Sequence, residues 1–223
     1  MNKKSLVIFN GSPRKNGTSY SFALTIKKLA GDEGNTAEII HIIEYFDGKK
    51  DFDNLKAIIS QSDIIGLVTP LYVDALPYPV IWFLEKLSFE LKQELSGKSF
   101  FAVSQSGFPD IRLFKPLLGS CRCFAEAVGM NWLGGLGYGG GAIIDGALME
   151  NLGKKGRKIT SGFKLALEDI IQGRKISSKA QDLLTLKIPT FLFRPLAAYL
   201  NHMARSTARK EGVKDIKRKV YLE

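Results

Sequence analysis

The chain has 223 residues, of which 45% are hydrophobic and 24% charged, a balance that excludes an intrinsically disordered chain and suits one globular domain with an appendage. No apolar run reaches the roughly 18 residues that a membrane span requires, and the run 6–9 is too short for a signal peptide, so we expect a cytoplasmic protein. The net charge of +10 is uneven: residues 1–153 carry 15 basic and 16 acidic side chains, whereas residues 154–223 carry 17 basic and 6 acidic ones. We therefore expect a near-neutral domain over residues 1–153 and a basic extension over residues 154–223. No zinc-finger or RNA-binding motif accompanies the charge, so we expect no nucleic-acid partner.

Strand and helix signals alternate along the first domain. Short apolar runs predict five strands, at residues 6–10, 37–43, 63–69, 99–104 and 131–136. Amphipathic patterns predict the helices between them, at residues 20–30, 54–61, 79–95 and 113–128. This alternation indicates a doubly wound parallel sheet in the order 2-1-3-4-5, where a ligand lies beyond the carboxyl ends of strands one, three and four.

The loop after the first predicted strand suits an anion. Gly11 and Gly17 let the backbone turn tightly, and the next helix begins with free N–H groups and a dipole that favour negative charge. We expect this loop to hold a phosphate through Ser12, Arg14, Asn16, Gly17, Thr18 and Ser19. The spacing matches neither the P-loop nor the dinucleotide pattern, and two glycines suit a terminal phosphomonoester better than a pyrophosphate.

The loops after the third and fourth strands complete the predicted site. Residues 69–77 place an aromatic and apolar surface between prolines that stiffen the chain, which suits a flat, apolar ring. A glycine in the fourth-strand loop permits close approach to such a ring. We therefore expect a ring to lie against Pro70, Leu71, Tyr72, Val73, Gln105, Ser106 and Gly107.

Other conspicuous residues have structural interpretations. The stretch Gly134–Gly141 contains G-x-G-x-x-G by letter but follows the fifth strand, so we interpret it as a flexible loop beside the site. Cys121 and Cys123 lie two apart in a helix, which excludes a Cys-x-x-Cys pair and favours buried, inert thiols. His41 and His202 are too far apart in sequence to support a metal site or a catalytic triad. We name no catalytic residue and no metal ligand.

The basic extension adds three predicted helices, at residues 159–172, 178–186 and 196–210. Pro189 and Pro195 predict that the apolar segment 191–193 is a bent connector. One face of the last helix is apolar at the helical spacing and needs a covering surface, at Leu196, Tyr199, Leu200 and Met203. The helix could dock on its own domain, reach across a dimer partner or lie on a membrane surface. We favour the arm across a partner, because it would bring cations near an anionic nicotinamide cofactor.

Two of the loops resemble motifs of a known family. The first resembles the G-S-P-R-x-x-G-N-T phosphate loop of the NADPH-dependent FMN reductase family and matches it at Gly11, Ser12, Pro13, Arg14 and Gly17. Thr18 and Ser19 stand where that family usually has Asn and Thr. The second resembles the family's T-P-x-Y-x-x-x-x-P pattern and matches it at Thr69, Pro70, Tyr72 and Pro77. The helix that follows resembles the family's F-L-D-R segment, with Ile81 where a lysine is common. The resemblance covers roughly residues 5–150.

This resemblance implies a flavodoxin-like α/β fold, FMN as cofactor and NADPH or NADH as electron donor. It also implies an enzyme that passes hydride to FMN and then electrons to a quinone, a nitro compound, an azo dye or free flavin. A homodimer is implied as well, and the apolar helix 79–95 supports it. Two other functions stay open: a flavodoxin-like electron carrier, and a non-enzymatic flavin-binding or membrane-surface protein that works through its basic tail.

Overall fold

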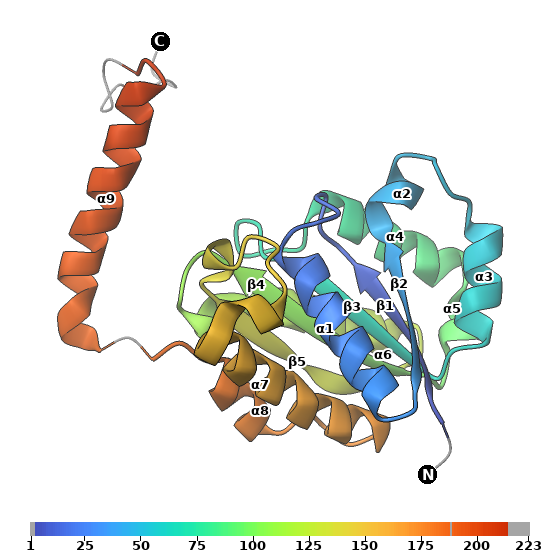
Figure 1. Cartoon of the computed structure of the whole chain (residues 1–223). Helices are drawn as coiled ribbons and strands as arrows, with labels where there is room; N and C mark the ends of the chain where they lie inside the picture. The colour runs from blue at the N-terminus through green and yellow to red at the C-terminus, as the bar shows by residue number, and fades with distance from the viewer. Residues whose placement is uncertain (1–2, 188, 214–223) are drawn as a thin grey trace. The chain divides into compact units, whose positions relative to one another are not determined.

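A five-stranded parallel sheet forms the centre of the compact unit that ends at Leu186 (Figure 1). The structure, a computed structural model, describes residues 3–187 and 189–213, without the side chains of Thr190 and Leu196. The strands are β1 (Ser5–Asn10), β2 (Thr36–His41), β3 (Ile64–Pro70), β4 (Ser99–Ser106) and β5 (Asn131–Gly139). Their order is β2-β1-β3-β4-β5 and every neighbouring pair is parallel, which confirms the predicted flavodoxin-like α/β topology.

Helices cover both faces of this sheet (Figure 1). Because side chains alternate along a strand, Phe101 and Val103 of β4 enter one core, whereas Phe100 and Ala102 enter the other. The first core is closed by α1 (Thr18–Asp32), α7 (Gly153–Ile171) and α8 (Ser178–Leu184). The second is closed by α2 (Ile42–Phe46), α3 (Phe52–Ser60), α4 (Tyr78–Glu90), α5 (Lys92–Leu95) and α6 (Lys115–Ala127). Short 3₁₀ turns lie at Ile111–Phe114, Gly141–Ile143, Met149–Leu152 and Thr190–Leu192.

The division between the compact units falls later in the chain than residue 153. The first unit runs to Leu186 and the second begins at Lys187. Helix α7 belongs to the first unit because Ile159, Phe163 and Leu167 are buried at helical spacing against the sheet. The basic residues of α7 therefore lie on a helix that the doubly wound fold itself requires.

Two predicted elements end differently in the structure. The second strand stops at His41, and Ile42 begins α2, where Ile42 and Tyr45 turn into the core. The helix predicted over 79–95 breaks at Leu91, whose buried side chain and non-helical backbone separate α4 from α5.

The glycine-rich segment predicted as a flexible loop is the second half of β5. Strand β5 continues to Gly139, and a Cβ at Gly135 or Gly137 would collide with the side chain of Leu118 or Phe114. These glycines therefore let the sheet approach α6 and the 3₁₀ turn before it, and the prediction of a loop over the whole segment is wrong.

The outer edge of β5 is covered by the chain that follows α7. The Ile176 backbone N–H donates to the Leu133 carbonyl, 2.8 Å away. The Gln181 side chain accepts from the Gly137 N–H and donates to the Gly137 carbonyl, each at 2.9 Å. A side-chain amide thus takes the place of a neighbouring strand, which protects the exposed edge of the sheet.

The second unit contains α9 (Phe193–Lys210). Its side chains Tyr199, Leu200 and Met203 are exposed, and Leu196, predicted on the same face, has a side chain outside the described residues. Pro195 lies in the first helical turn, where a missing N–H costs no hydrogen bond, so the predicted connector ends before Phe193. Among the described helices, none combines the length and apolarity that crossing a membrane requires.

Candidate functional site

The sheet register gathers the three predicted loops at one edge. Asn10 at the end of β1 pairs with Val68 of β3, and Pro70 at the end of β3 pairs with Gln105 of β4. Because these strands are parallel and adjacent, their carboxyl ends lie side by side. The loops that follow β1, β3 and β4 therefore border a common region.

The β1–α1 loop is shaped by its own polar groups. The Asn10 side-chain oxygen accepts from the Ser12 backbone N–H at 3.2 Å, and the Ser12 hydroxyl oxygen accepts from the Arg14 backbone N–H at 3.2 Å. The Gly11 N–H donates to the Val68 carbonyl at 2.8 Å, which ties the loop to β3. These bonds hold Ser12 buried and leave the Arg14 side chain 74% exposed.

The residue at Gly11 must be small. A Cβ there would lie 2.8 Å from the Val80 side chain and 2.9 Å from the Thr69 hydroxyl, both closer than real contacts. Glycine therefore lets the loop cross between β3 and α4.

Helix α1 begins with backbone N–H groups that no N-cap side chain accepts from. Its N-cap residue, Gly17, has no side chain to accept from them, and the first turn holds no acidic residue. Such N–H groups have no partner inside a helix, and together with the dipole they favour an anion. Asn16 is exposed at this point, whereas Thr18 and Ser19 are buried.

The hydroxyl groups of α1 also fix neighbouring loops. Thr18 Oγ1 donates to the Gly141 carbonyl at 2.8 Å, and the Ser21 hydroxyl donates to the Ala147 carbonyl at 2.5 Å. Ser19 Oγ lies 3.4 Å from the Gln105 side-chain nitrogen. The hydroxyl proton of Thr18 is therefore engaged in a bond within the protein, and the backbone N–H of Thr18 is the donor that it can offer to a ligand.

The loop after β3 contains a strained turn. The Tyr72 and Ala75 backbones exchange hydrogen bonds of 3.1 and 3.0 Å, and Val73 and Asp74 between them have φ values of 48° and 60°. Left-handed backbone is costly for a β-branched residue, about 1–3 kcal/mol, and such strain clusters at functional sites. The turn presents Val73, 98% exposed, and Tyr72, 50% exposed, at the predicted ring wall.

The loop after β4 is joined to both of its neighbours. The Leu71 N–H donates to the Gln105 carbonyl at 2.8 Å, and the Ser106 hydroxyl donates to the Phe108 carbonyl at 3.0 Å. On the other side, Gly139 ends β5 against this loop, where a Cβ would lie 2.5 Å from the Pro109 backbone. Gly107 is exposed at the tip of the loop.

A charged cluster adjoins the β1–α1 loop at the end of β2. Glu44 forms an ion pair with Lys15 and another with Lys50, the latter at 2.8 Å. Hydrogen bonds from these two lysines lower the pKa of Glu44 to about 2, so the carboxylate stays ionised. His41 stands between this cluster and Asn10, and burial is the main cause that lowers its pKa.

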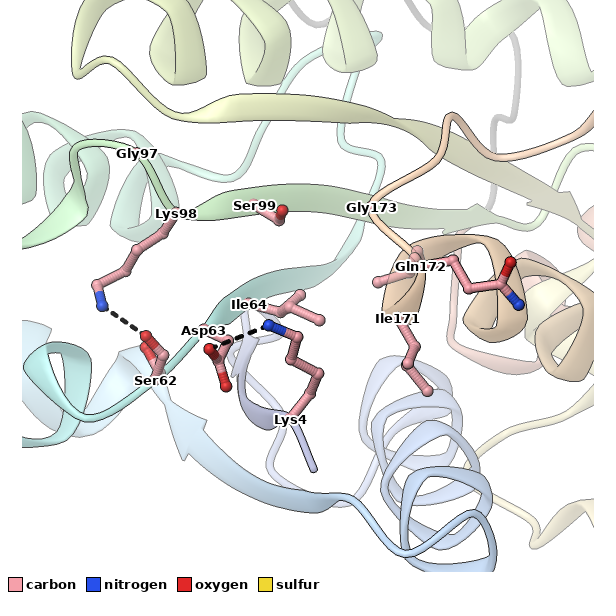
Figure 2. Close-up of a pocket in the computed structure, with 11 residues that line it drawn as sticks. Lys4, Ser62, Asp63, Ile64, Gly97, Lys98, Ser99, Ile171, Gln172 and Gly173 are labelled. Atoms are coloured by element: carbon pink, nitrogen blue, oxygen red, sulfur yellow. Dashed lines mark hydrogen bonds and ion pairs between the residues drawn. The ribbon is translucent and has the colours of Figure 1, made fainter. Parts of the chain in front are cut away.

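Two other features lie apart from the loops. A hollow of about 370 Å³ lies at the amino ends of β3 and β4. Lys4 pairs there with Asp63 at 3.4 Å, and Lys98 donates to the Ser62 carbonyl (Figure 2). Its cations are already engaged within the protein.

The two cysteines differ in burial. The thiol of Cys121 is buried, which raises its pKa to about 12, but Cys123 is exposed, so the prediction of two buried thiols is wrong for Cys123.

Comparison with known proteins finds one family whose sequence model matches this chain. Residues 4–110, which hold all three loops, match the sequence model of the NADPH-dependent FMN reductase family. This part of the chain is similar to that family. The protein is accordingly an NAD(P)H-dependent oxidoreductase that uses FMN. None of the curated proteins matches this sequence significantly.

Solved structures share the fold at low sequence identity. The Trp repressor binding protein from Bacillus subtilis is 18% identical, with a TM-score of 0.56 over 71% of this chain and 98% of its own. A general stress protein 14 from Treponema denticola, solved in complex with FMN, is 12% identical, with a TM-score of 0.56 over 75% of this chain and 99% of its own. An NAD(P)H:quinone oxidoreductase from Methanothermobacter marburgensis is 12% identical, with a TM-score of 0.55 over 76% of this chain and 98% of its own. At these identities the likeness shows the fold alone.

The residues present suit an FMN reductase. The exposed Arg14 guanidinium, the Ser12 hydroxyl and the uncapped N–H groups of α1 form a donor set for a phosphomonoester. The turn at Tyr72 supplies apolar surface for a ring. Sequence reasoning missed Asn10, His41 and Asp145, the last of which reaches Arg14 at 3.7 Å from a distant loop. No local pattern in the sequence indicates these long-range contacts.

Proposed function

We propose that the protein binds FMN with its phosphate on the β1–α1 loop and its ring along the turn at Tyr72. The observation that carries this proposal is the concentration of phosphate donors on an uncapped helix beside that turn. The phosphate would be held by Ser12, Arg14, Asn16, Gly17, Thr18 and Ser19, and the ring by Pro70, Leu71, Tyr72, Val73, Gln105, Ser106 and Gly107.

We propose further that the enzyme reduces small acceptors. When bound, FMN would accept a hydride from NADPH or NADH and return two electrons to a quinone, nitro compound, azo dye or free flavin. The protein's part is to orient both reactants, and the hydride transfer requires no side-chain acid or base. Both cysteines are free, in keeping with the reducing cytoplasm that we propose as the site of action.

Turnover separates this proposal from the alternatives. The purified protein with FMN should consume NADPH or NADH steadily when a quinone is supplied. An electron carrier would bind FMN without steady consumption of reduced nicotinamide. A protein that shows no turnover but sediments with anionic vesicles would instead support the membrane-surface function.

We also propose a homodimer, and we infer that α9 forms an arm on the partner. Between α4 and α6 lies an apolar groove of about 380 Å³ that begins at Ala75 and Leu76, next to the ring wall, and includes the 39% exposed Ile81. Leu87 of α4 is buried and Trp82 is partly buried against the core of its own chain, whereas Ile81 remains exposed and is available to a partner.

The arm can be tested in the full-length chain. Replacing Tyr199 and Met203 together by serine should weaken dimerisation at least about tenfold, because two apolar side chains that the partner would cover are lost. Sedimentation and the KM for NADPH are the measurements, with His202→Ser as the matched control on the same helix. A dimer of unchanged strength with unchanged KM would contradict the arm. Loss of vesicle binding in that case would favour the membrane surface.

A further inference from the structure

A line of hydrogen bonds runs from His41 to the β1–α1 loop. His41 ends β2 and pairs in register with Asn10, the last residue of β1. The His41 Nδ1 lies 3.0 Å from the Asn10 side-chain nitrogen. On its other side, the fully buried Asn10 amide accepts the Ser12 N–H through its oxygen at 3.2 Å, and Ser12 in turn accepts the Arg14 N–H.

The Ser12 bond determines the direction of the whole line. A backbone N–H can only donate, so the Asn10 atom facing Ser12 must be the oxygen, and the atom facing His41 must be the NH₂ group. His41 Nδ1 must then accept, which requires a neutral imidazole with its proton on Nε2. A protonated His41 would place an N–H against the Asn10 NH₂ group.

The surroundings of His41 make it the group that can titrate here. Tyr20 packs against the ring, with centroids 5.1 Å apart. Glu44 favours the charged form of His41, whereas burial, Lys15 and Lys50 oppose it, and the pKa of His41 lies below its ordinary value of 6.5. Glu44 itself is ionised far below this range and the pKa of Lys50 is raised, so neither changes charge near neutral pH.

We propose that neutral His41 is a positioning residue that, through Asn10, holds the β1–α1 loop in the shape that binds the phosphate of FMN, and that protonation of His41 releases it. To accept from a protonated His41, the Asn10 amide must turn its oxygen toward the ring. Its NH₂ group would then face the Ser12 N–H, and the bond that shapes the loop would be lost. This inference rests on the proposed FMN site.

The direction of the pH effect follows from the pKa shift. Neutral His41 prevails above pH 6.5, so the contribution of His41 to FMN affinity is fully present there. Affinity falls as the pH drops below that value and His41 becomes protonated. The phosphate of FMN also takes up a proton near pH 6, so a variant without the histidine is needed as a reference.

Two substitutions isolate the role of His41. The change His41→Asn offers an amide oxygen in place of Nδ1 and cannot titrate, whereas His41→Phe keeps a ring beside Tyr20 but accepts nothing. Between about pH 7.5 and about pH 5.5, the parent should lose more FMN affinity than His41→Asn, as judged by flavin absorbance titration, and the difference should stay below about tenfold because the pKa of His41 is lowered. His41→Phe should bind weakly at both pH values. An equal loss in the parent and in His41→Asn would overturn the inference.

A second measurement works without FMN. In ¹⁵N–¹H spectra of the ligand-free protein, the Ser12 amide signal should shift with the ionisation of His41, and it should stay constant over the same pH range in His41→Asn. A Ser12 signal that ignores the ionisation of His41 would overturn the inference even if FMN binds. If neither the parent nor the variants bind FMN, but the Ser12 signal of the parent follows the ionisation of His41, the proposed function is refuted and the coupling between His41 and Ser12 is retained.

Discussion

Replacing Arg14 by alanine should weaken FMN binding roughly ten- to a hundredfold. A charged hydrogen bond to a phosphate contributes about 1.5–3 kcal/mol, and the loop exposes the Arg14 guanidinium, whereas its other cation, Lys15, is paired with Glu44. Its ion pair with Asp145, at 3.7 Å between exposed side chains, is too weak to retain it against a dianion. Titration of the ligand-free protein with FMN, followed by absorbance, measures the change.

Riboflavin and a distant arginine are the controls for this result. Riboflavin lacks the phosphate, so it should bind the parent much more weakly than FMN does, and Arg14→Ala should hardly change its affinity. Arg122→Ala, on α6 and paired with Glu126, should bind FMN like the parent. Ser12→Ala should also weaken FMN binding, since it removes a hydroxyl that shapes the loop. Parent-like affinity in both Arg14→Ala and Ser12→Ala would exclude the loop as the phosphate site.

A methyl group at Gly139 should both destabilise the protein and impair FMN binding. The added Cβ would lie 2.5 Å from the Pro109 backbone and 2.6 Å from the Phe108 carbonyl oxygen, and neither backbone atom can move without shifting the loop after β4. We expect Gly139→Ala to lower the free energy of unfolding by about 1–3 kcal/mol, as overpacking does. Urea denaturation and FMN titration together measure the two effects.

Gly119 offers the opposite case on α6. A Cβ at Gly119 meets nothing within 4 Å, so Gly119→Ala should raise the free energy of unfolding by about 0.5–1 kcal/mol through helix propensity alone and leave FMN binding unchanged. If Gly139→Ala binds FMN as tightly as the parent, the end of β5 does not support the loop.

The sheet was predictable because its signals are local. Each buried strand is a short apolar run, and the helices between them carry an apolar face, so a doubly wound parallel sheet follows from the alternation. The order 2-1-3-4-5 is one of the common orders of such sheets. The end of the sheet domain, predicted at residue 153, could not be located from such local signals. Charge separates α7 from the domain, but the burial of Phe163 joins α7 to it, and burial depends on what the rest of the chain places opposite.

The candidate site also contains residues that local sequence signals indicate and residues that only long-range contacts reveal. Ser12, Arg14 and Tyr72 lie within loops whose composition already indicates a phosphate and a ring. His41 and Gly139 act across the sheet, through Asn10 and through Pro109. The composition of the glycine-rich segment of β5 predicts a loop. The close packing that these glycines permit depends on the position of α6, which the local sequence does not indicate.

The most direct test of the account is the reduction of bound FMN. Ligand-free protein should take up one FMN per chain, with its phosphate required for tight binding, and anaerobic addition of NADPH or NADH should bleach the flavin absorbance. Reoxidation by a quinone should then restore the absorbance. A protein that takes up no FMN, or that binds FMN without reduction by either nicotinamide, would contradict the proposed function.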